Sequence, residues 1–409
     1  MASSSLKSLR SSYLAVHALL MLADWLQGTN MYTLYQSYGV NVGALFLTGF
    51  CTSAICGTFV GTLVDYIGRR NGCILYCVLE ILIQLLEHVN DFRVLLAGRV
   101  IGGLTTSLLF SAFESWLVAT HRSKDLDKSS LSEIFSVASV ITGLTAVLAG
   151  LIARVTFLYL GDIGPFQVAA ALTFIALCLI FALWEDDKGN SHSKKHGGNR
   201  ASGIGDIVCL AWKDATASPT TIALGLSTAL FEGAMYTFVF LWVPVLQRVT
   251  AESYERAPTE LVFSCMMVCI AIGGIAYKRR PLGVYSSRST GLAISAAAAA
   301  SMASCAIALS LLRPAESQIY ILVNFFAFEA TVGAFNPWAA SARSEHFPSR
   351  VVTTVMNMYR VPLNGIVVMG VYLADALEAR DVFWVCFALH ALAFSINYFM
   401  FEEKALKQD

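Results

Sequence analysis

A lone arginine lies inside an apolar stretch that is long enough to cross a membrane. The sequence around it is Asn357-Met-Tyr-Arg360-Val-Pro362-Leu-Asn364. On a helix the two asparagines fall about one turn either side of Arg360, on nearly the same face. A guanidinium has five N–H donors in a planar fork, so together with flanking amides it could bind the oxygens of a tetrahedral oxyanion. Pro362 removes one helical hydrogen bond, and we expect it to open the helix near the arginine.

Four acidic residues also lie within apolar stretches, and each could bind a proton. They are Asp24, Glu114, Glu232 and Glu329. An ionised side chain in the middle of a bilayer costs several kcal/mol, so such a group usually faces a cavity or a partner. Two interpretations stay open. In one, the acids take up and release protons. In the other, they are fixed counter-ions of Arg99 and Arg360, the two arginines within apolar stretches.

One acid and two bases are clustered in a short segment between two apolar runs. The segment reads Gly61-Thr-Leu-Val-Asp65-Tyr-Ile-Gly68-Arg69-Arg70. The two arginines alone would serve as a positive stop beside a membrane helix, but that does not explain the two glycines and the acid. The segment resembles the G-x-L-a-D-x-x-G-R-R/K signature that follows the second helix of major facilitator transporters. In that family the Asp and Arg residues form a charge clasp, which forms and breaks as the two halves rock.

Composition indicates that membrane-spanning helices position these residues. The chain has 409 residues, of which 56% are hydrophobic and 14% charged, and its mean hydropathy is +0.63. Soluble domains have about 25% charged residues. A helix needs about 20 apolar residues to cross the hydrocarbon core. Twelve runs meet that need: 13–39, 43–64, 72–89, 93–120, 131–156, 164–185, 219–246, 259–277, 289–312, 317–341, 351–375 and 381–401.

A long polar segment, rich in Lys, Gly, Ser and Asn, divides these runs six and six. We therefore predict an all-α integral membrane protein with two pseudo-symmetric six-helix bundles. The predicted parts are an N-terminal bundle over 1–185, a cytosolic linker over 186–218 and a C-terminal bundle over 219–409. The pattern Phe-x-Ala-Phe-Glu ends at both Glu114 and Glu329, which pairs the fourth run with the tenth as a parallel repeat requires.

The distribution of basic residues predicts the orientation. Most of the 28 Lys and Arg residues fall in segments on the side of the N-terminus, so both termini are expected in the cytosol, with the plasma membrane as the expected location. The net charge is zero, which gives no basic field for nucleic acid. The sequence has no P-loop, complete Gly-x-Gly-x-x-Gly or nucleophile elbow, so we expect neither an enzyme nor a bound cofactor. We expect no metal site, and a monomer in the lipid bilayer.

Several stretches resemble the molybdate-anion transporter branch of the major facilitator superfamily, also called domain-containing protein 5. They reach from the first run to the eleventh and include Ala23-Asp24-Trp25-Leu26-Gln27, Gly98 to Gly103, Leu230-Phe231-Glu232 and Tyr359-Arg360-Val361-Pro362-Leu363. The resemblance covers nearly the whole chain and includes the charges within the apolar runs. It implies a twelve-helix carrier for molybdate in a eukaryotic membrane.

The resulting hypothesis is a secondary carrier of molybdate, or a similar tetrahedral dianion, that works by alternating access. Arg360 would contact the oxyanion, Glu232 or Glu329 would carry a coupling proton, and Arg99 would have a structural or coupling role. The candidate substrate-binding residues are Arg360, Asn357, Asn364, Gln27 and Tyr32.

Two other functions stay open. A carrier of neutral sugars or polyols would use Gln27 and Tyr32 for hydroxyl contacts. A membrane sensor or scaffold that transports nothing would not need the clasp around Asp65.

Overall fold

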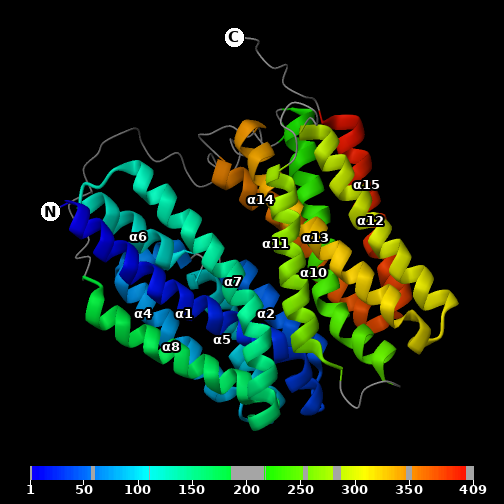
Figure 1. Ribbon diagram of the computed structural model, residues 1–409, viewed down its shortest axis with the longest axis horizontal. Helices are drawn as coiled ribbons and strands as arrows, with labels where there is room; N and C mark the ends of the chain where they lie inside the picture. Colours follow the sequence, from blue (N-terminus) through cyan, green and yellow to red (C-terminus); the bar gives the residue numbers. More distant parts are fainter. Residues whose placement is uncertain are drawn as a thin grey trace. The chain divides into compact units, whose positions relative to one another are not determined.

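The computed structural model describes residues 2–56, 60–109, 111–185, 216, 218–251, 257–279, 287–346 and 352–401 (Figure 1). All the regular structure in these residues is α-helical. The chain forms two compact units. The first comprises Met1–Gly197 and Pro258–Ser264, and the second comprises Gly198–Ala257 and Cys265–Asp409.

The described helices of the first unit follow the apolar runs of the sequence closely. They are α1 (Ala2–Ser37), α2 (Val42–Cys56), α3 (Val60–Ile67), α4 (Arg69–Leu86), α5 (Phe92–Leu109), α6 (Ala112–Ser123), α7 (Lys128–Leu160) and α8 (Gly164–Leu183). The second expected span contains α2 and α3, and the fourth contains α5 and α6; residues 57–59 and 110, between them, lie outside the described residues. Helix α1 begins well before the first apolar run, and it packs against α7 and α8.

The second unit continues the pattern of long apolar helices. Its helices are α10 (Pro219–Thr250), α11 (Thr259–Arg279), α12 (Ser287–Leu311), α13 (Pro314–His346), α14 (Val352–Ala376) and α15 (Ala379–Met400). Aromatic rings fill its core: Phe231 on α10 stacks on Phe335 of α13, with 3.8 Å between the ring centroids. Across the described residues of both units, eight helices are long and apolar enough to cross a membrane.

The beginning of α11 belongs to the first compact unit. Its Glu260 side chain is completely buried. Asn30 Nδ2 donates a hydrogen bond to Glu260 Oε1 at 3.1 Å, and Arg154 Nη1 lies 3.8 Å from Glu260 Oε2. One turn further on, Ser264 Oγ donates to the carbonyl oxygen of Val147 at 2.9 Å. These polar contacts tie the first turns of α11 to α1 and α7.

Close packing of α2 against α5 depends on Gly103. A Cβ atom at this position would lie 2.6 Å from both Ser53 N and Thr52 Cβ, so a methyl group cannot be added unless the helices separate. We expect Gly103→Ala to lower the free energy of unfolding by about 1–3 kcal/mol, the usual cost of overpacking. Thermal unfolding of the purified protein measures this. Gly143→Ala on α7 is the matched control, because no atom lies within 4 Å of its added Cβ. An equal loss in both variants would contradict the packing argument.

Candidate functional site

A cavity of about 170 Å³ lies within the second unit. Its volume is several times the ~30 Å³ that one water molecule occupies in the liquid, so a small oxyanion has room in it. Helix α10 supplies one wall, and single turns of α13 and α14 supply the rest. The lining residues are Gly225, Thr228, Ala229, Glu232, Arg343, Tyr359, Arg360 and Leu363.

Two arginines and one acid set the charge of this cavity. Glu232 interacts electrostatically with both Arg343 and Arg360. Glu232 and Arg343 are partly buried, whereas the Arg360 side chain is exposed. Two guanidinium groups against one carboxylate leave one positive charge in excess. The cavity therefore favours an anion, and it favours a dianion more when the carboxylate is protonated.

Two hydroxyl groups stand beside these charges. Thr228 Oγ1 is buried and has no hydrogen-bond partner within the described part of the chain, so its O–H group is available as a donor. The Tyr359 ring packs directly over Gly225, where any side chain would displace it. Gly225 thus fixes the position of the tyrosine next to Arg360. The arrangement offers two planar forks and the unpartnered Thr228 hydroxyl group to a ligand rich in oxygen.

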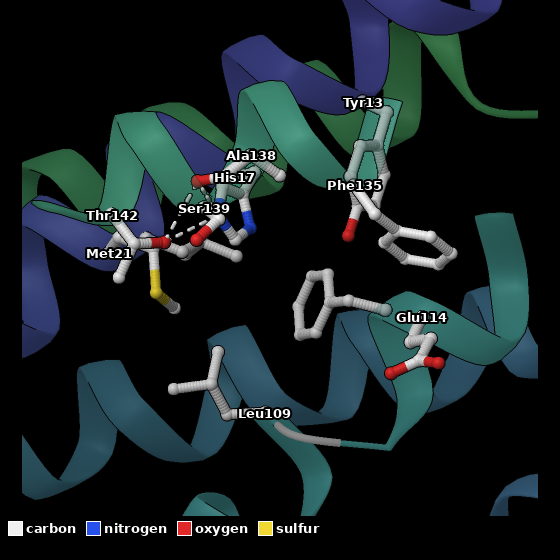
Figure 2. A pocket seen from close by; sticks show the side chains of 11 residues that line it. Tyr13, His17, Met21, Leu109, Glu114, Phe135, Ala138, Ser139 and Thr142 are labelled. Carbon is white, nitrogen blue, oxygen red and sulfur yellow. Dashed lines mark hydrogen bonds between the residues drawn. The ribbon is translucent and has the colours of Figure 1, made fainter. Parts of the chain in front are cut away.

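A second cavity, of about 250 Å³, lies within the first unit and has a different chemistry (Figure 2). His17 Nε2 lies 3.0 Å from Thr142 Oγ1 and 3.2 Å from the carbonyl oxygen of Ala138. Figure 2 shows Glu114 on the wall opposite these residues. The rest of the lining is mostly apolar and aromatic, for example Phe113 and Phe135. A cavity whose fixed charge is one carboxylate repels an anion, so it does not suit the oxyanion.

The structure brings together only part of the residue set predicted from the sequence. Arg360 and Glu232 share the cavity of the second unit, but Asn364 is not among the described residues that line it. The Asn357 side chain lies outside the described residues. Pro362 does not break its helix, since α14 runs unbroken from Val352 to Ala376, and the expected opening there is not observed.

Gln27 and Tyr32 belong to the first unit, and Gln27 already has a partner there. It is 7% exposed, and its Nε2 donates to Glu80 Oε2 at 3.1 Å. Tyr32 is partly buried, and the Asp24 side chain is exposed. Glu329 on α13 is only 5% exposed and lines neither of the two cavities described above.

The structure describes part of the segment that carries the predicted clasp. Gly68 lies between α3 and α4 and has a φ of +93°. A positive φ favours glycine, which explains why the motif has a glycine at this position. Arg69 and Arg70 begin α4, and Arg70 Nη2 donates to the carbonyl oxygen of Phe181 on α8 at 3.3 Å. Gly61 and Asp65 fall within α3, but the Asp65 side chain lies outside what the structure describes. The clasp itself therefore stays a prediction.

Three functional candidates escaped the sequence analysis. Arg343 follows the apolar run 317–341 and was not among the candidates, but α13 extends to His346 and Arg343 lines the cavity. Glu80 and Glu87 lie in the apolar run 72–89 and were overlooked as acids within the membrane, so more than four acids lie within the apolar runs. Their signal was present in the sequence, since both interrupt that run. The sequence did not show the reason for their burial, which is a partner on another helix.

The chain matches a family described as sugar transporters with 12 transmembrane segments, over residues 2–317. The chain belongs to this family of the major facilitator superfamily. This transporter is 29% identical to the molybdate-anion transporter of Xenopus laevis, over 91% of its own length and 81% of the relative. It is 28% identical to the molybdate-anion transporter of Takifugu rubripes, over 88% of its own length and 78% of the relative.

Solved structures confirm the fold of this transporter. The nucleoside transporter NupG superimposes with a TM-score of 0.72 at 12% identity, over 97% of this chain and 100% of that one. An auto-inhibited peptide transporter of the POT family superimposes with a TM-score of 0.71 at 12% identity, over 98% of each chain. The predicted all-α major facilitator fold is thus confirmed, and the protein is a multi-pass membrane transporter.

Proposed function

We propose that this transporter is a secondary-active carrier of molybdate, or of a similar tetrahedral oxyanion, and that it works by alternating access. The observation that carries the proposal is the cavity with two guanidinium groups, Arg343 and Arg360, and a single carboxylate, Glu232. Thr228 and Tyr359 add hydroxyl groups beside the charges. The names of the relatives in Xenopus laevis and Takifugu rubripes agree with this chemistry.

Protons are the proposed coupling ions. An inside-negative potential of 100 mV opposes entry of a dianion by about 4.6 kcal/mol, at about 2.3 kcal/mol per charge. Entry of two or more protons with the dianion would cancel or reverse that charge. Glu232 can contribute one of them. When it is protonated it no longer competes for Arg343 and Arg360, so oxyanion and proton would bind together.

In the proposed cycle the two six-helix bundles, 1–185 and 219–409, rock relative to one another in the plasma membrane, with both termini in the cytosol, and open the cavity of the second unit to each side in turn. The clasp at Gly61, Asp65, Gly68, Arg69 and Arg70 would set the balance between the two states, and Glu329 is a second candidate for the coupling acid.

Uptake by purified protein in proteoliposomes tests the substrate class. We expect an inward proton gradient to drive accumulation of molybdate, and an excess of tungstate to inhibit it, because tungstate has the same charge and tetrahedral shape. Neutral sugars such as glucose and polyols such as mannitol should not inhibit. Inhibition by the sugars, with none by tungstate, would contradict the oxyanion assignment.

A carrier of neutral sugars or polyols is the second candidate. The description of the matching family as sugar transporters favours it. The hydroxyl groups of Thr228 and Tyr359 could contact a sugar. Against it, hydroxyl recognition does not require two arginines in one cavity, and burying part of their charge without an anion is costly.

A further inference from the structure

One face of α4 buries three polar side chains in the first unit. Glu80, Gln84 and Glu87 are spaced i, i+4 and i+7, so they lie on one side of the helix. Their exposed fractions are 7%, 0% and 1%. None of them lines the cavities described above. A helix in a membrane does not need acids on its buried side for packing, so this face requires another explanation.

A neighbouring helix holds both carboxylates in place. Gln27 Nε2 donates to Glu80 Oε2 at 3.1 Å. Tyr35 Oη donates to Glu87 Oε1 at 2.7 Å. Both partners come from α1. The two acids are therefore fixed by specific contacts.

The charge of one arginine acts on both acids. Arg99 on α5 interacts electrostatically with Glu80 and with Glu87. Its guanidinium group lies against Gly49, with Nη1 3.1 Å from Met31 Sδ. One guanidinium can neutralise only one of the two carboxylates. An extra negative charge in this setting costs several kcal/mol, and a bound proton removes that cost.

Buried polar atoms without a hydrogen-bond partner also indicate that this site binds a proton. Within the described residues, both amide atoms of Gln84, Glu87 Oε2 and Arg99 Nε are buried and have no hydrogen-bond partner. Gln84 lies between the acids along α4. A proton on Glu87 Oε2 would convert it into a donor, for which the amide oxygen of Gln84 is an acceptor one turn away. Hard metal cations take about six oxygen ligands, far more than the two unpartnered oxygens here, so a proton fits better.

Other titratable groups surround this site, and they affect its charge. Among the described residues they are Asp24, Tyr35 and Tyr38 from α1 and its C-terminal turn, Tyr76, Cys77 and His88 from α4 and its C-terminal turn, and Asp162 before α8. Asp24 is exposed and interacts electrostatically with Glu80.

We propose that Glu80, Glu87 and Arg99 form a proton switch in the first unit. Arg99 pairs with one carboxylate while the other holds a proton. When the proton moves, the O–H bond at Glu87 breaks, one forms at Glu80, and the guanidinium group shifts to the newly ionised Glu87. The step conserves charge, since one proton and one ion pair exist before and after it. Its use in oxyanion transport rests on the proposed function, but proton binding itself does not.

Infrared difference spectroscopy of the purified transporter at neutral pH measures the proton directly, through the C=O stretch of a protonated carboxyl group. We expect Glu80→Gln and Glu87→Gln each to remove one such band relative to wild type, because the remaining carboxylate pairs with Arg99. Arg99→Gln should add one band, since both acids then hold protons. Glu316→Gln, an exposed acid at the start of α13, is the control and should change nothing.

These outcomes separate the switch from the proposed function. The bands require no substrate, so they stand even if the transporter carries a sugar. A spectrum unchanged in both Glu80→Gln and Glu87→Gln overturns the switch. If a glutamine variant does not fold, Arg99→Gln decides alone, and the absence of an added band there also overturns it.

Discussion

Replacing Arg360 or Arg343 by lysine is expected to weaken molybdate binding by roughly tenfold or more. Lysine keeps the positive charge but loses the planar fork that can donate two parallel hydrogen bonds to an oxyanion. A hydrogen bond to a charged group contributes about 1.5–3 kcal/mol, and 1.4 kcal/mol corresponds to a factor of ten in affinity. Binding of molybdate to the purified variants, by calorimetry, measures the change. Both residues line one cavity, so both substitutions should act.

Arg313→Lys is the matched control, because Arg313 is exposed in the turn before α13 of the same unit. A structural role gives a different pattern. If Arg360 is only the counter-ion of Glu232, then lysine should be tolerated, and Arg360→Ala should regain wild-type binding when combined with Glu232→Gln. Wild-type affinity in Arg360→Lys, or in that double variant, would contradict the assignment of Arg360 to the oxyanion.

Hydropathy predicted the architecture well, for a physical reason. A bilayer requires long apolar helices whose backbone bonds are satisfied internally, so length and composition determine the elements. The segment between the runs 43–64 and 72–89 was also apparent in the sequence, and the structure places the helix break at Gly68, whose positive φ favours glycine. Helix ends were less predictable. Arg343 follows the last apolar residues of its run, and only the structure shows that α13 continues to His346.

Pairing between distant residues was the part that the sequence could not predict. Gln27 looked like a substrate ligand because it is polar in an apolar run, but its amide group is bonded to Glu80. A side chain with an internal partner and one that awaits a ligand have the same sequence signature. Glu260 is a further example. Its partners Asn30 and Arg154 lie far away in the chain, and the sequence near Glu260 does not indicate them.

Two residues that line the cavity of the second unit could be singled out from the sequence, because they are charged. Arg360 and Glu232 stood out as charges in apolar runs, and the structure places them in one cavity. Thr228 and Gly225 carried no such signal. A threonine in a helix usually bonds to its own backbone, and only the buried unpartnered Oγ1 atom distinguishes Thr228.

Glu232→Gln is expected to abolish accumulation of molybdate driven by a proton gradient while exchange of molybdate across the membrane continues. Glutamine keeps the size and hydrogen-bonding capacity of the acid but cannot release a proton. In the wild type the ionised Glu232 competes for Arg343 and Arg360, so molybdate binding should weaken as the pH rises. The glutamine variant has no such competitor. Its molybdate affinity should be as high as that of the wild type at low pH, and independent of pH.

Two measurements in proteoliposomes decide this: accumulation under an inward proton gradient, and exchange with no gradient. Glu329→Gln should be compared directly, since Glu329 is the other buried acid of the second unit that was predicted to couple. Glu316→Gln again serves as the exposed control. If Glu232→Gln accumulates molybdate as the wild type does, the proton that drives transport is not bound at the oxyanion cavity. Accumulation lost only in Glu329→Gln would instead place coupling on α13, away from the two arginines.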